Sequence, residues 1–457
     1  MKLKKIALPL ALMATLVSPM TDYFAAPVEA AAQQSAAVSR QPLVSVQKLD
    51  HGEVTVYDYG NIRLHAYKTN DVLSDECYVV EGKGGLVLLE SAAFKENVQE
   101  FDRYIKSLKK PLKGKLLSYH SNGYNTYADA PVYATEKALA SWGENGGVTA
   151  LTNNFVKTFG DTVDTNLPAK ATIVRDGEVV SIAGIDFRIL PTPDEDYSVE
   201  IPAINVVYRH MLGSKVHNIL PSVDYIDAEI ADMKNYQQAG YSLILTSHNV
   251  PEGQEAVREK LDYLHKVKEL AFTSPDKDSF IENVKAAFPD YAGENYLEMS
   301  AGALFPEAQT LPAMQDSGSE ADIKAIKDVI STYADSITNY DLAAAATIWQ
   351  MDDRTTFIHP RGNEYGWNAI KDNFYGVTMH DTFSQRHLYI HDINVQVYGD
   401  TAVSVFYWDF PAVFRSDGVD ITTHGRETQV YRRTGEGWKI VHVHYSNMPV
   451  TGAKAGF

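Results

Sequence analysis

The chain has 457 residues, a formal net charge of −18 at pH 7, a pI near 5.2 and 45% hydrophobic residues. The acidic balance excludes nucleic acid as an expected partner, because clustered Lys and Arg drive binding to a phosphate backbone, and it disfavours an anionic membrane surface. The length and apolar content predict two or three folded domains.

The N-terminus predicts export. Three lysines among the first five residues precede an apolar run over residues 6–17, and small residues follow, which is the pattern of a signal peptide over residues 1–30. The run is shorter than the roughly 20 residues that a membrane span needs. We therefore expect a periplasmic or extracellular protein with no membrane partner. The single cysteine, Cys77, cannot form an intramolecular disulfide.

The next part of the chain, residues 42–305, is predicted to be an α/β domain. Apolar runs separated by turn residues predict strands, and a pair of glycines inside one run predicts a hairpin. Apolar residues at helical spacing predict helices between these strands. The expected strand-rich segments are 54–60, 61–70, 77–91, 113–120, 172–193, 204–222 and 241–248, and the expected helical segments are 97–109, 228–240 and 255–288.

A second domain is predicted over residues 319–450. Residues 306–318, which are rich in Pro, Ser and Gly and poor in apolar residues, predict a linker. After the linker, an amphipathic helix begins near Ala321 and a shorter helix extends to Trp349, and several strands follow. This order predicts a separate α+β domain.

The first domain resembles the metallo-β-lactamase superfamily over roughly residues 42–305. The resemblance rests on a hairpin and helix that lead to LLSYHSNGYNTYADAPVYATEKALASW, on the later segment MLGSKVHNIL and on LTSHNVPEG. It implies a four-layer αββα sandwich. It also implies a cleft in which the family's active members bind two zinc ions.

The resemblance also implies that most metal ligands are lost. The family motif H-x-H-x-D-H reads His120-Ser121-Asn122-Gly123-Tyr124-Asn125, so only its first histidine remains. The middle histidine falls in a loop of acids, the bridging carboxylate becomes Ser214, and the last histidine matches His248. Catalytic zinc normally has three protein ligands and an open position. We therefore expect no metal, no cofactor and a catalytically degenerate cleft, formed by His120, Asn122, Tyr124, Asn125, Asp194, Ser214 and His248.

Three interpretations of this cleft remain open. Its polar residues could be inherited with the fold and have no function. The cleft could bind a small ligand through neutral hydrogen bonds. In a third interpretation, a remodelled site for one metal ion joins His120 and His248 with a carboxylate of the loop that contains Asp194, Glu195 and Asp196.

The second domain resembles the SnoaL-like group of the nuclear-transport-factor-2-like superfamily. The opening helix with ITNYDLAAAATIW, the segment GDTAVSVFYWDF and the ending GRETQVYRRTGEGWKIVHVHYS carry the resemblance. It implies an α+β cone in which a curved antiparallel sheet wraps around helices and leaves a pocket. The superfamily includes isomerases, dehydratases and oligomerisation modules, so the resemblance implies a pocket without a particular reaction.

Histidine, tryptophan and arginine side chains are the candidates for lining this pocket. His442 and His444 are two residues apart on a strand and so share one face, and Arg426 shares a face with His424. His442 and His444 could act as general acid or base, and Arg426 could hold an anion. An alternative places these residues in the core or at a dimer face. The predicted ligand-binding residues are Trp349, His359, Trp367, Trp408, His424, Arg426, His442 and His444.

Together these patterns predict an exported two-domain protein that binds a small molecule in its second domain without catalysis. One alternative is an enzyme, either a hydrolase with a remodelled metal site or an acid/base isomerase or dehydratase. Another is a scaffold that forms a homodimer through the C-terminal domain. The sequence does not identify the small molecule.

Overall fold

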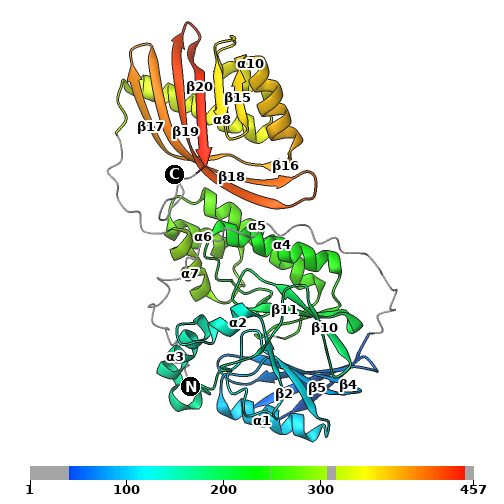
Figure 1. Cartoon of the computed structure of the whole chain (residues 1–457). Coiled ribbons are helices and arrows are strands. Elements are labelled where there is room, and N and C mark those ends of the chain that lie inside the picture. The colour runs from blue at the N-terminus through cyan, green and yellow to red at the C-terminus, as the bar shows by residue number, and fades with distance from the viewer. Residues whose placement is uncertain (1–40, 249, 306–314, 448–457) are drawn as a thin grey trace. The chain divides into compact units, whose positions relative to one another are not determined.

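The computed structural model describes residues 41–248, 250–305 and 315–447 (Figure 1). The predicted signal peptide and residues 306–314 of the predicted linker lie outside these ranges. We call residues 41–305 the N-terminal region and residues 315–447 the C-terminal region. No helix within the described ranges is long and apolar enough to cross a membrane.

The first sheet of the N-terminal region has eight strands in sequence order. The neighbouring pairs from β1 to β5 are antiparallel, and those from β5 to β8 are parallel. Helix α1 (Lys95–Ser107) connects β5 to its parallel neighbour β6. The strands are β1 (Leu43–Lys48), β2 (Gly52–Asp58), β3 (Arg63–Thr69), β4 (Glu76–Gly82), β5 (Gly85–Leu89), β6 (Leu112–Leu116), β7 (Val132–Ala134) and β8 (Thr172–Ile173).

The second sheet has the order β13-β12-β11-β10-β9, and only its β12–β13 pair is parallel. Its strands are β9 (Val179–Ile182), β10 (Ile185–Pro191), β11 (Tyr197–Ile201), β12 (Val206–Tyr208) and β13 (Leu243–Leu245). Helix α4 (Val223–Ala239) connects β12 to β13. The other helices of the region are α2 (Glu136–Ser141), α3 (Gly147–Phe159), α5 (Gln254–Thr273), α6 (Lys277–Ala287), α7 (Glu294–Leu304) and the short 3-10 helices η1 (Gly160–Thr162) and η2 (Pro202–Ile204).

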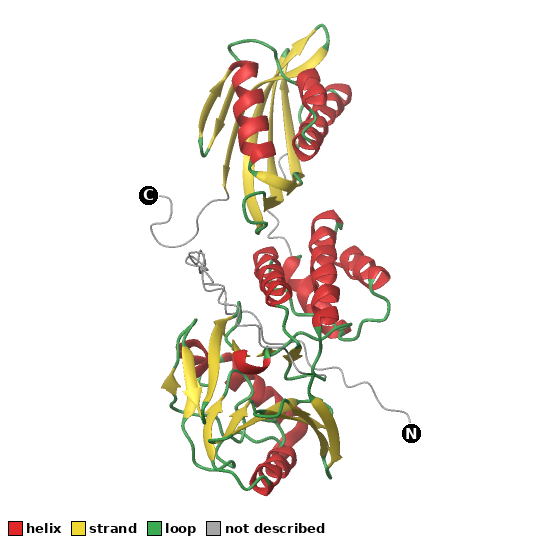
Figure 2. Ribbon diagram, turned by 90° about the vertical axis from the view of Figure 1, so that its right-hand side faces the viewer, coloured by secondary structure: helices red, strands yellow, loops and turns green. Residues whose placement is uncertain are grey.

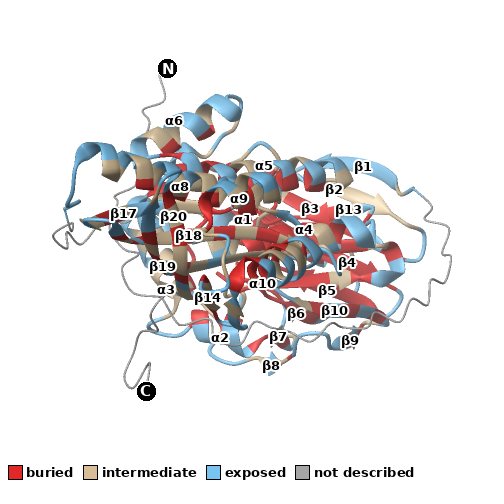
Figure 3. Ribbon diagram, turned by 90° about the horizontal axis from the view of Figure 1, so that it is seen from above, coloured by how far each residue is buried: buried red, intermediate tan, exposed pale blue. Residues whose placement is uncertain are grey.

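Both sheets of the N-terminal region contribute to one hydrophobic core, which also includes the apolar face of α1. A second cluster joins the other face of β12 and β13 to α4 and α5. Every residue of β4 and β5 is buried, as expected of strands covered on both faces, and Figure 3 shows such buried strands in the interior. The strand and helix order therefore agrees with the α/β pattern predicted for this part of the chain.

The C-terminal region is a curled sheet packed against helices (Figure 2). Its sheet has the order β15-β14-β20-β19-β18-β16, and β17 also pairs with β18. All pairs are antiparallel except β14 with β20. The strands are β14 (Thr356–His359), β15 (Gly362–Tyr365), β16 (Phe383–Arg386), β17 (Tyr389–Tyr398), β18 (Thr401–Phe414), β19 (Asp420–Thr434) and β20 (Gly437–Asn447).

The helices of this region are α8 (Glu320–Asn339), α9 (Leu342–Ile348), α10 (Gly366–Ala369) and a π-helix, η3 (Ile370–Asp381). Ser319 caps α8 by accepting a hydrogen bond from the Asp322 amide, so α8 begins one residue before the predicted start at Ala321. Asp341 caps α9, which ends at Ile348, one residue before the predicted end at Trp349. The predicted linker ends earlier than expected, because the Ser317 backbone pairs with Val395 and Val397 of β17.

Candidate functional site

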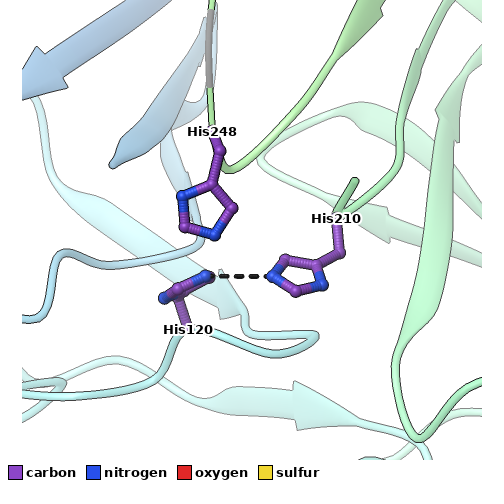
Figure 4. A group of neighbouring side chains, drawn as sticks. All are labelled: His120, His210 and His248. Carbon is purple, nitrogen blue, oxygen red and sulfur yellow. Dashed lines mark hydrogen bonds between the residues drawn. The ribbon is translucent and has the colours of Figure 1, made fainter. Parts of the chain in front are cut away.

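Three histidines converge at strand ends in the N-terminal region (Figure 4). His120 follows β6, His210 follows β12, and His248 follows β13. Since β12 and β13 are parallel neighbours, their carboxyl ends meet at one edge of the second sheet. The topology thus brings together residues that are up to 128 positions apart in the sequence (248 − 120).

The geometry of this histidine cluster suits one metal ion. The Nε2 atoms of His120 and His210 are 3.1 Å apart, and one nitrogen from each of the three rings lies within 4.8 Å of the others. A tetrahedral zinc ion with Zn–N bonds of 2.0–2.1 Å needs nitrogens about 3.3 Å apart. The three rings therefore fit the ion with small shifts. Among the described residues, no fourth histidine, cysteine or acidic side chain joins this group.

The expectation of only two histidines in this cleft is wrong, because His210 is the third. The resemblance assigned the nearby ligand position to Ser214, four residues further along the chain. In the structure Ser214 donates its amide and hydroxyl hydrogens to Glu252. The signal that could have found His210 is its place two residues beyond the short buried strand β12, because His120 and His248 also follow strands, four residues beyond β6 and three residues beyond β13.

Carboxylates lie behind two of the three rings. Asp75 Oδ1 is 3.5 Å from His248 Nδ1, and Asp196 Oδ2 is 3.7 Å from His210 Nδ1. His248 Nδ1 is hydrogen-bonded to the Leu73 carbonyl oxygen at 3.3 Å, and an acceptor beside Nδ1 favours the tautomer whose Nε2 lone pair is free to bind a metal. The predicted set of two histidines and one carboxylate is therefore not the arrangement observed. Asp196 supports His210, and the exposed Asp194 accepts a hydrogen bond from Tyr225.

Glu90 fixes the loop that carries His120. This fully buried carboxylate follows β5 and accepts hydrogen bonds from the backbone amides of Ser118, Tyr119 and His120, at 2.5, 3.1 and 2.6 Å. Its own φ of 65° lies in the left-handed region, which is unfavourable for a residue with a side chain. A buried residue held in such a conformation at a site is typical of a functional constraint. Glu90 is therefore a positioning residue for His120.

The rings of the cluster are neutral near pH 7. Burial lowers the pKa of His120 and of His210 well below the usual range, and the neighbouring histidines lower both further. Burial also lowers the pKa of His248. Only the neutral imidazole has a lone pair for a metal ion. The cluster is thus in its metal-binding form without any change of protonation.

The remaining predicted cleft residues do not join the cluster. Asn122 donates hydrogen bonds to Thr152 Oγ1 and to the Asp164 carbonyl oxygen, at 3.1 and 2.7 Å. Tyr124 lies near Lys115, whose ammonium donates to the Tyr124 carbonyl oxygen. Asn125 is exposed. The hydrogen bonds of Asn122 and Tyr124 hold the loop after β6 in place. These two residues therefore have a structural role that requires no ligand.

In the C-terminal region a β-bulge determines which side chains face the core. Tyr431 of β19 pairs with Ile440, whereas Val430 pairs with His442, so Val441 is an extra residue in β20. A bulge reverses the alternation of side chains beyond it. Val443 is therefore buried and His444 is exposed. The prediction that His442 and His444 line the interior is wrong for this reason.

The eight predicted ligand-binding residues divide between the interior of the C-terminal domain and the outer face of its sheet. Half of them are buried in the interior, namely Trp349, His359, Trp367 and Trp408. The other half belong to the outer face, where Arg426 and His444 are exposed, His442 bonds to Thr356 and His424 bonds to Asp409. The sequence predicted that His424 and Arg426 share a face, which is observed, but that face points away from the core. The interior instead contains polar residues that no pattern in the sequence singled out, namely Tyr333, Ser404, Glu427, Gln429 and Tyr431.

The fold of the C-terminal region defines an α+β cone, and comparisons with known proteins identify its family. The model of the SnoaL-like domain family matches residues 326–451. An NTF2-like superfamily protein from Salmonella enterica serovar Typhimurium LT2 is 41% identical, and the match covers 31% of this chain and 100% of that one with a TM-score of 0.30. The chain therefore belongs to the NTF2-like superfamily through its C-terminal domain.

Two further solved structures that match the C-terminal region are 24% and 17% identical. The CaMKII hub of S. rosetta is 24% identical, with 31% of this chain and 100% of that one covered and a TM-score of 0.24. A hexachlorocyclohexane dehydrochlorinase (LinA) of type 2 is 17% identical, with 29% and 91% covered and a TM-score of 0.26. None of the curated proteins matches the chain.

Proposed function

We propose that the N-terminal region is a hydrolase that binds one divalent transition-metal ion, zinc by preference, through His120, His210 and His248. The observation that carries this proposal is the convergence of three neutral imidazoles on one point. Three histidines are a ligand set of catalytic zinc, and they leave a fourth position for water, whereas structural zinc sites are closed by four protein ligands. Bound there, the ion would lower the pKa of that water and supply a nucleophile.

The proposal includes a metallo-β-lactamase-like fold for the N-terminal region. The sequence resemblance supports it, together with two sheets that share a core and helices that pack on each sheet. The proposed site differs from the family's pattern. Here three histidines would bind one ion, whereas active members of the family bind two ions with two sets of ligands. The sequence alone favoured a non-catalytic cleft. We propose the hydrolase alternative in its place, because His210 supplies the third ligand that the cleft lacked.

Hydrolysis of p-nitrophenyl acetate by the full chain tests the proposal. We expect the chelator-treated protein to be inactive, activity to return with about one equivalent of zinc, and His210→Ala to stay inactive with zinc supplied. His265→Ala, a change in the same region outside the cluster, is the control. A zinc-loaded protein that is no faster than free zinc would show that the site binds metal without activating water.

Changing the carboxylate behind His210 should weaken metal binding without removing a ligand. We expect Asp196→Asn to reduce zinc affinity by about 10- to 100-fold, because loss of such supporting groups has effects of this size. Competition with a chromophoric chelator measures the affinity. Asp194→Asn is the matched control, since Asp194 is exposed and bonds to Tyr225. Equal affinities of the two variants would contradict the role of Asp196.

For the C-terminal domain we propose binding of a small molecule inside the cone. Its support is the interior set of aromatic and polar side chains. We also propose export, from the pattern of residues 1–30, and a homodimer formed through the C-terminal domain. Light scattering of the mature chain tests the dimer, and a mass of one chain at micromolar concentration would exclude it.

A further inference from the structure

We infer that the end of β3 and the loop after it bind one calcium ion through side-chain oxygens of Thr69, Asp71 and Asp75. The loop spans residues 70–75, between β3 and β4 of the N-terminal region. The inference concerns a hard cation held by oxygen atoms. It therefore goes beyond the hydrolase proposal and does not depend on zinc binding by the three histidines.

Three buried oxygen atoms of this segment have no hydrogen-bond partner among the described residues. They are Thr69 Oγ1, Asp71 Oδ2 and Asp75 Oδ1, which we call the oxygen cluster. Thr69 is 1% exposed, and Asp75 is fully buried. Nearly all buried polar atoms of native proteins have a partner, because an unsatisfied one is destabilising. Three such atoms within residues 69–75 therefore indicate a bound group.

Strand pairing brings Thr69 and Asp75 together. Lys68 of β3 pairs with Glu76 of β4, and one step further the Thr69 amide donates to the Asp75 carbonyl oxygen at 2.9 Å. Thr69 and Asp75 are thus opposite each other on neighbouring strands. Side chains of opposite residues lie on the same face of a sheet, a short distance apart. The Thr69 hydroxyl is therefore directed to the same side as the Asp75 carboxyl group.

The turn places the Asp71 carboxyl group near that of Asp75. Asp71 Oδ1 accepts hydrogen bonds from the amides of Leu73 and Ser74, at 2.8 and 3.1 Å. The Leu73 carbonyl oxygen and Asp75 Oδ1 lie 3.3 and 3.5 Å from one atom, His248 Nδ1. Burial raises the pKa of Asp75, and the charge of Asp71 adds to this, so the two carboxyl groups are close enough to repel each other.

A divalent cation suits these oxygens. Among the residues that the structure describes, no Lys or Arg forms an ion pair with Asp71 or Asp75. A water molecule would leave the two carboxylates without compensating charge, whereas a divalent ion matches them. Calcium binds roughly six to eight oxygens in flexible geometry, with waters among them, whereas magnesium demands near-octahedral geometry and dehydrates reluctantly. An irregular loop with hydroxyl and carboxylate oxygens therefore favours calcium.

Isothermal titration of calcium chloride into the chelator-treated full chain tests the inference at pH 7 in physiological salt. We expect about one calcium ion per chain with a Kd of about 10⁻⁴ to 10⁻³ M, as in extracellular calcium-binding modules. Calcium at about ten times this Kd should raise the melting temperature by about 3 °C. Magnesium should bind at least about tenfold more weakly, because it demands a stricter geometry.

Asp71→Asn distinguishes a calcium ligand from a structural residue. The amide oxygen of asparagine can still accept hydrogen bonds from Leu73 and Ser74, but the charge and one ligand oxygen are lost. We expect calcium affinity to fall by more than about tenfold. Without calcium the variant should melt no lower than the wild type, because a like charge is removed, and with calcium it should melt lower. A purely structural role of Asp71 would lower the melting temperature in both conditions.

Two further variants are controls. Asp176→Asn removes an exposed acid of the same region and should leave calcium binding unchanged. His210→Ala removes a proposed zinc ligand and should also leave it unchanged, because the oxygen cluster contains no part of His210.

The outcomes separate this inference from the hydrolase proposal. The inference is overturned if calcium does not raise the melting temperature, if magnesium raises it equally, or if Asp71→Asn keeps the calcium affinity. Loss of calcium binding in His210→Ala would also overturn it, since calcium would then occupy the histidine cluster. None of these results bears on zinc-dependent hydrolysis, which is measured without calcium.

Discussion

Replacing His210 by alanine is expected to abolish stoichiometric zinc binding by the full chain. His210 supplies one of three nitrogens that converge within 4.8 Å, and its loss leaves two protein ligands for the ion. We expect the affinity to fall by more than about 100-fold, because changes to supporting groups alone reach 10- to 100-fold. Competition against a chromophoric chelator measures the affinity.

His265→Ala is the control for this experiment, because His265 lies on α5 outside the cluster. His120→Ala and His248→Ala should behave like His210→Ala. Unchanged zinc affinity in His210→Ala, with loss in the other two variants, would contradict the three-histidine site. It would favour the set of two histidines and one carboxylate that the sequence suggested.

Replacing Glu427 by glutamine is expected to stabilise the C-terminal domain at neutral pH. The pKa of Glu427 is about 8 in the folded state because of burial, compared with about 4.3 for a free glutamate. Between these values the folded state holds a proton that the unfolded state has released, so stability falls as the pH rises from about 4.3 to about 8. At 1.36 kcal/mol per pKa unit, the variant should gain up to about 3 kcal/mol at pH 7 and nothing near pH 4.

Urea unfolding followed by tryptophan fluorescence measures this difference. The described C-terminal region contains Trp349, Trp367, Trp408 and Trp438, so the signal reports mainly on that domain. At each pH the free energy of unfolding of the variant is compared with that of the wild type. The contributions of other buried acids, such as Glu90 in the N-terminal region, cancel in this difference. Glu436→Gln, at an exposed position, is the control. A stability difference that does not grow with pH would mean that Glu427 is not buried as a neutral acid.

Periodicity in the sequence predicted the first two helices of the C-terminal domain and the strands after them, but not α10 or η3. The apolar spacing after Ala321 predicted α8, and the sequence predicted that strands follow the two helices, of which the last two, β19 and β20, form an antiparallel pair. Periodicity did not determine which face of β20 is buried. The extra residue Val441 reverses the alternation, and no local residue pattern marks a bulge at that position.

The histidine cluster was only partly predictable, because its three residues come from distant strand ends. His120 and His248 were identified through motifs, whereas His210 belongs to no motif and was passed over in favour of Ser214. Matching positions to the family's motifs assigns the wrong residue where the chain has changed the type of ligand. The parallel pairing of β12 with β13 is what places His210 beside His248, and this pairing is a tertiary feature.

X-ray absorption at the zinc K-edge, combined with metal analysis of the loaded full chain, tests the central claim most directly. The three-histidine site predicts about one zinc per chain, with three imidazole nitrogens and one oxygen at about 2.0 Å. No bound zinc, two ions per chain, or a single ion with only two imidazole ligands would contradict it.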